Sequence, residues 1–144
     1  MVRMNSLLLV LFFGTLAPVT GSDYCRQEVC RPVAHSARPG VLLNSYATGN
    51  GRELTLRREL RTDGFVNVSL TLSLKGPGSG DLVNIQRFVK AFTGAQYSAE
   101  FLASCLGRAG GRERPFVRAL PTMRMPVDLV CSRTGVTLQE AGKP

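Results

Sequence analysis

Five apolar side chains alternate with polar ones from Val66 to Leu74, and this pattern limits the fold more than any other feature of the chain. Alternation with a period of two is typical of a strand that has one face in the core and one in water. A second alternating run covers Glu53 to Leu60, and Asp63-Gly64 between the two runs is a hairpin turn signal. We therefore predict a β-hairpin.

A helical pattern follows the hairpin. Asp81 can cap a helix whose apolar residues recur on one face as far as Phe92, and Gly94 just beyond suits the end of such a helix. A second, shorter helix is predicted from Ser98 to Leu106, with Cys105 on its inner face. Both helices therefore have an apolar side that must pack against the sheet.

Two further segments complete the predicted fold. Residues 23–50 are interrupted by proline and glycine and are predicted as an extended lead-in. Residues 123–131 alternate again, and Pro126 within them favours a strand at the edge of a sheet. Strands, then helices, then a strand predict an α+β domain: a small antiparallel sheet with one or two packed helices, stapled by disulfides. An all-β sandwich is the alternative if the helix ending at Phe92 is misassigned.

The first residues have the three regions of an export signal. Arg3 precedes an apolar run at residues 7–13, and small residues follow, so that cleavage is predicted after Gly21 or Ser22. The run is shorter than the roughly 20 apolar residues that span a bilayer, and we expect no transmembrane segment. We predict a signal peptide at 1–22, a single secreted, extracellular domain at 23–140 and a disordered tail at 141–144.

The even number of cysteines in an exported chain predicts two disulfides. The four residues are Cys25, Cys30, Cys105 and Cys131. Three pairings are possible, and we favour those that link the first two cysteines to the last two, because cross-links that close long loops restrict the unfolded chain most. The cysteine spacing and the single histidine are a poor match to a zinc site, and no metal or other cofactor is predicted.

Asn67 begins an N-glycosylation sequon, Asn67-Val68-Ser69. The alternation of this strand places Asn67 on the polar face, where an attached glycan would stay in water. The two observations agree, and we predict that Asn67 is exposed and glycosylated.

The chain is strongly basic, with 18 Lys and Arg against 10 Asp and Glu and a formal net charge of +8. Such an excess attracts anionic partners, among them sulfated glycans, acidic proteins and membrane surfaces, although solvated arginines are the simpler alternative. Nucleic acid is not an expected partner, because no base-reading motif accompanies the charge. The candidate anion-binding residues are Arg52, Arg57 and Arg61 around the predicted hairpin, and Arg108, Arg112 and Arg114 in a predicted glycine-rich loop.

No catalytic signature accompanies these features. His35 is the only histidine, and the motifs of serine hydrolases, zinc proteases and P-loop enzymes are absent. We predict that the protein is no enzyme but an extracellular binding module, either a soluble ligand or an accessory subunit of a receptor or adhesion complex. Its expected partner is a cell-surface or extracellular protein, with sulfated glycans as a further candidate. The alternatives are a carrier that holds a small apolar ligand between sheet and helix, and a small secreted hydrolase.

Overall fold

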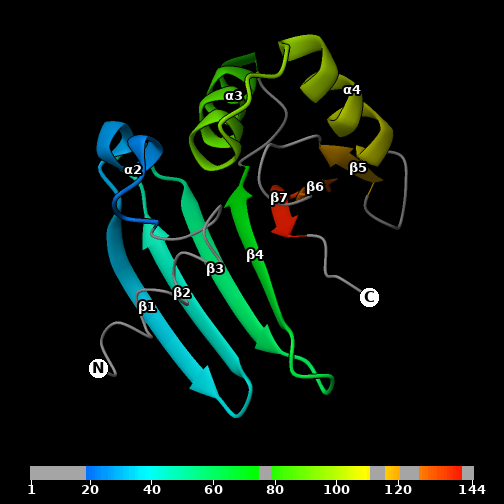
Figure 1. Ribbon diagram of the computed structural model, residues 1–144. Helices are drawn as coiled ribbons and strands as arrows, with labels where there is room; N and C mark the ends of the chain where they lie inside the picture. Colours follow the sequence, from blue (N-terminus) through cyan, green and yellow to red (C-terminus); the bar gives the residue numbers. More distant parts are fainter. Residues whose placement is uncertain (1–18, 75–78, 111–115, 121–126, 141–144) are drawn as a thin grey trace.

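The computed structural model describes residues 19–74, 79–110, 116–120 and 127–140, and these form one antiparallel sheet with helices at one end of it (Figure 1). The helices are α2 (Asp23–Glu28), α3 (Ser79–Thr93) and α4 (Ala99–Gly110). The strands are β1 (Arg31–Arg38), β2 (Val41–Ala47), β3 (Glu53–Leu60), β4 (Val66–Ser73), β5 (Phe116–Leu120), β6 (Val127–Cys131) and β7 (Gly135–Glu140). Their order across the sheet is β1-β2-β3-β4-β7-β6-β5.

The predicted hairpin is confirmed. β3 and β4 pair antiparallel from Leu54 opposite Leu72 to Leu60 opposite Val66. Gly64 in the connecting turn has φ of 86°, a left-handed value that favours glycine. The alternate residues of β4 are buried, which matches the predicted apolar face.

The sheet is larger than predicted, because it has seven strands. β1 and β2 form a second hairpin where an extended lead-in was expected, and Pro39-Gly40 makes its turn, with φ of 78° at Gly40. The edge position predicted from Pro126 is wrong, since β6 pairs with β7 on one side and β5 on the other. Pro126 itself precedes β6 and lies outside the described residues.

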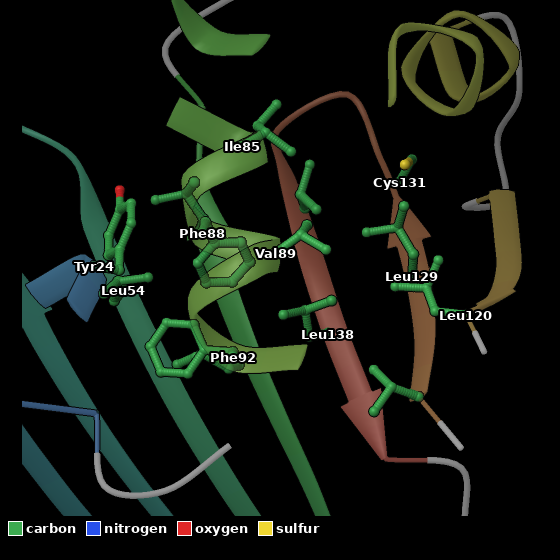
Figure 2. Packing of buried hydrophobic residues seen from close by; sticks show 14 of the residues in the cluster. Tyr24, Leu54, Ile85, Phe88, Val89, Phe92, Leu120, Leu129, Cys131 and Leu138 are labelled. Atoms are coloured by element: carbon green, nitrogen blue, oxygen red, sulfur yellow. The ribbon is translucent and has the colours of Figure 1, made fainter. Parts of the chain in front are cut away.

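The core forms where α3 packs on the inner face of the sheet. Figure 2 shows Ile85, Phe88, Val89 and Phe92 of this helix directed toward side chains of the strands. The ring of Tyr24, from α2, meets that of Phe88 edge-on at a centroid distance of 5.7 Å. The predicted helix is therefore real and its apolar face is buried, so the all-β alternative does not apply.

Two disulfides staple this core, but the favoured pairing between distant cysteines is wrong. Cys25 bonds Cys30, and Cys105 bonds Cys131. The first pair closes at the end of the short helix α2, where the chain turns at Val29 and brings the two Cα atoms to 4.8 Å. The second pair joins the inner side of α4 to the inner face of β6, so the packing of helix on sheet decides the pairing.

No helix in the described ranges is long and apolar enough to cross a membrane. The helices of the fold are instead amphipathic elements that cover one end of the sheet.

We expect Gly135→Ala to destabilise the protein by about 1 to 3 kcal/mol, because a Cβ there would lie 2.8 Å from the backbone oxygen of Leu72 on the neighbouring strand. Gly107→Ala is the matched control. No atom lies within 4 Å of the added Cβ, and alanine favours the helix by about 0.5 to 1 kcal/mol. Urea unfolding of both variants checks this. Equal effects would contradict the close approach of β7 to β4.

Candidate anion-binding site

The arginines predicted around the hairpin do not form one patch. Arg52 pairs with Asp81 of α3, whereas Arg57 pairs with Glu59 at 3.0 Å on the outer face. Arg61 pairs with Asp63 at 2.7 Å in the turn, beyond the other end of β3. Since a strand advances about 3.3 Å per residue, Arg52 and Arg61 lie roughly 30 Å apart. Each of the three guanidinium groups already has a carboxylate partner.

Two residues of the second predicted group, Arg112 and Arg114, lie outside the described residues. Arg108 is described, and it belongs to the last turn of α4 rather than to a loop, since the helix continues to Gly110. Its guanidinium carbon lies 5.3 Å from the centre of the Phe116 ring on β5. Of this predicted group the structure therefore describes one residue, which lies beside an aromatic ring.

Arg118, on β5, joins Arg108 in a reciprocal arrangement. The guanidinium carbon of Arg118 lies 4.7 Å from the centre of the Phe101 ring on α4. Phe101 and Arg108 are seven residues apart, two turns along the same helix face, while Phe116 and Arg118 are two apart on the same strand face. Each element therefore offers one aromatic ring to an arginine of the other. We call these four residues the arginine–aromatic cluster.

A third ring extends this cluster. Tyr97 stacks on Phe101 with the ring centres 5.3 Å apart and the planes 28° from parallel. A guanidinium held over an aromatic face is positioned by cation–π attraction without using its N–H donors, which stay available to an anion. No described carboxylate forms an ion pair with Arg108 or Arg118. The cluster therefore has donors and positive charge to offer.

Part of this cluster has a signal in the sequence. Phe101 and Arg108 are seven residues apart, a spacing that would place them on one helix face, but the predicted helix ends at Leu106; Phe116 and Arg118 alternate as in a strand. Sequence reasoning did not predict β5, so Arg118 was not among the candidates. Only the packing of α4 on β5 shows that the two arginines belong together.

Asn67 lies on the outer face of the sheet, away from the helices. It stands opposite Glu59 in the β3–β4 register and is partly exposed. The outer-face side chains of several strands surround a shallow hollow of about 490 Å³, which Asn67 and Ser69 help to line. An attached glycan would lie over this polar face, and glycosylation itself stays a prediction.

A separate buried network ties α2 to α3 and to the loop before β3. The Glu28 carboxylate, 9% exposed, accepts from Asn84 and Asn50 and pairs with Arg87 at 2.6 Å. The Tyr24 hydroxyl donates to Asn84 Oδ1 at 2.6 Å. Burial, followed by the negative charge of Glu28, raises the pKa of Tyr24 to about 12. Tyr24 therefore stays protonated at physiological pH, and the network links these segments by hydrogen bonds and an ion pair.

Other chemistry is sparse in the part of the chain that the structure describes. His35 is exposed on β1 and lies 2.5 Å from Asn44 Oδ1. No group of three or more His, Cys, Asp and Glu side chains that could hold a metal ion occurs within these ranges. A carrier would hold its ligand between the sheet and the helix that bears Phe88 and Phe92, but these side chains are 0% and 4% exposed and contact each other in the core.

No family model, curated protein or solved structure matches this chain.

Proposed function

We propose that this protein is a secreted basic glycoprotein that acts as an extracellular binding module, and that the arginine–aromatic cluster holds a sulfated glycan. The observation that carries the proposal is the contrast among the described arginines. Arg52, Arg57 and Arg61 are neutralised by carboxylates, whereas Arg108 and Arg118 rest on aromatic rings and pair with no carboxylate of the described residues. Their positive charge is therefore available to a partner.

The chemistry of the cluster suits a sulfated glycan. Guanidinium groups donate in a planar fork that matches the oxygens of sulfate, and in this cluster each guanidinium is held over the face of a neighbouring ring. Phe101 and Phe116 are partly buried, so the cluster lies near the surface. The net charge of +8 adds a long-range attraction for polyanions.

Two other features support an extracellular setting. The two disulfides are compatible with an oxidising compartment. Asn67 occupies a solvent-facing position on β4, which suits a glycan added during export. With the predicted signal peptide, these features favour a secreted protein.

We expect Arg108→Gln/Arg118→Gln to weaken binding to heparin by roughly ten- to a hundredfold, because two charge-assisted hydrogen-bonding groups are lost. The measurement is the salt concentration that elutes the secreted protein from a heparin column and from a cation exchanger of similar charge density. The double substitution should lower the eluting salt concentration more on the heparin column than on the cation exchanger.

Arg57→Gln/Arg61→Gln is the matched control. It also removes two positive charges, but from arginines that are paired with carboxylates. This variant should elute from both columns with equal, small shifts. If both double variants elute from heparin at the same salt concentration, net charge alone explains the weaker binding, and a glycan site at the cluster is contradicted.

A further inference from the structure

The edge strand β1 is open to solvent along its whole length. All eight of its residues are exposed, and among the described strands β2 alone pairs with it. The opposite edge, β5, has five residues and contacts α4. Figure 1 shows β1 and β2 extending well beyond the helices. A free strand edge presents unpaired backbone N–H and C=O groups that a further strand can bind.

The two ends of β1 differ as pairing surfaces. Pro32 has no backbone N–H, and the register with β2 is irregular between Pro32 and Ala34, so Val33 lies in a bulge. These features limit unspecific pairing at that end. From Ala34 to Arg38 the register is regular, which leaves five consecutive residues as a template for an added strand.

Charge indicates what kind of strand fits this edge. Arg31 and Arg38 are exposed, and neither forms an ion pair with a described carboxylate. No Asp or Glu occurs between Val29 and Arg52, the stretch that holds both β1 and β2. The nearest strand with acidic residues is β3, two strands away, about 10 Å across the sheet. The edge is therefore basic at both ends.

A hollow of about 510 Å³ lies beside the bulged end of β1, and Pro32, Val33, His35 and Tyr46 help to line it. Val33 is 52% exposed there. An apolar side chain of an added strand has a place to pack at this end, next to the charge of Arg31.

The same charges argue against a second copy of this chain as the occupant. Two β1 strands paired antiparallel about the centre of the strand would place Arg31 of each copy opposite Arg38 of the other. Like charges directly opposite one another destabilise a strand pair. A strand with acidic residues would instead place opposite charges at these positions.

We infer that the β1 edge binds an extended, acidic segment of a partner protein by strand addition. The inference rests on the proposed binding role and names the class of protein partner. It uses a different surface from the arginine–aromatic cluster, so the two proposals can fail separately.

The test uses the secreted protein and a ten-residue peptide of alternating glutamate and valine, with alternating lysine and valine as the reversed-charge peptide. We expect the glutamate peptide to slow amide hydrogen exchange at alternate residues of Ala34–Arg38, and the lysine peptide to leave it unchanged. Arg31→Ser/Arg38→Ser should weaken binding of the glutamate peptide roughly five- to tenfold, as expected for two exposed ion pairs.

Arg57→Ser/Arg61→Ser, which changes the net charge equally, should bind the peptide as the unaltered protein does. So should Arg108→Gln/Arg118→Gln, whatever its behaviour on heparin. Thermal melts confirm that the variants are folded. Three results would overturn the inference: no protection in β1, protection by both peptides alike, or protection without peptide in a protein that sedimentation shows to be a dimer.

Discussion

Removing the disulfide between Cys105 and Cys131 is expected to lower the free energy of unfolding by about 3.5 kcal/mol, whereas removing Cys25–Cys30 lowers it by about 2 kcal/mol. The two bonds span sequence separations of 26 and 5, and a longer closed loop restricts the unfolded chain more. The longer bond also joins α4 to β6 through two side chains that are each 1% exposed.

Urea unfolding of the double alanine variants measures both effects. The shorter bond is the internal control, because it joins the buried Cys25, 3% exposed, to the partly buried Cys30 but closes only a local loop. Equal losses in the free energy of unfolding would show that the length of the closed loop does not determine how much each disulfide stabilises the protein. Peptide mapping without reduction tests the pairing directly, and a fragment that links Cys25 to either distant cysteine would contradict it.

Glu140→Gln is expected to stabilise the protein by about 3 kcal/mol at pH 8 and to have almost no effect near pH 4. Burial raises the pKa of Glu140 from 4.5 to about 7, against an opposing effect of the Arg58 charge. Glu140 is 4% exposed, and its Oε1 atom has no hydrogen-bond partner among the described residues. The charged form is therefore costly in the folded protein.

The sign follows from the protons bound in each state. Between pH 4.5 and 7 the unfolded chain has lost the proton of Glu140 while the folded protein still holds it. Raising the pH through this window favours the unfolded state, so the contribution of Glu140 to stability falls with rising pH and levels off above pH 7. Glutamine cannot ionise, and the variant loses this dependence.

The measurement is the difference in free energy of unfolding between the variant and the unaltered protein, taken by urea titration at several pH values. Other titrating groups cancel in this difference. Glu53→Gln, at an exposed position on the same sheet, should give a flat difference within about 0.5 kcal/mol. A flat curve for Glu140→Gln as well would contradict the raised pKa.

The β3–β4 hairpin and α3 were predictable because each has a local pattern. β4 has one buried face, which requires alternation, and α3 has one buried stripe, which requires helical spacing. β1 was missed for the opposite reason. A strand that is exposed on both faces has no apolar periodicity, and Pro39-Gly40 was the only local sign of its hairpin.

The candidate site was predictable only in part. Arginine content and the glycine-rich segment indicated an anion-binding surface, but they could not separate arginines that meet carboxylates from those that do not. Arg57 and Glu59 lie on the same strand face two residues apart, a pairing that local spacing suggests. Arg118 and Phe101 are brought together only by the contact of β5 with α4.

By itself the sequence determined the basic charge, the even cysteine count, the sequon and the elements with a strong apolar period, because all of these depend on residue type and local spacing. The tertiary structure decided the strand order, the disulfide pairing, the open edge at β1 and the arginines left without carboxylates. These depend on contacts between residues far apart in the chain, whose free energy is gained only when the elements pack together, and local patterns contain no record of them.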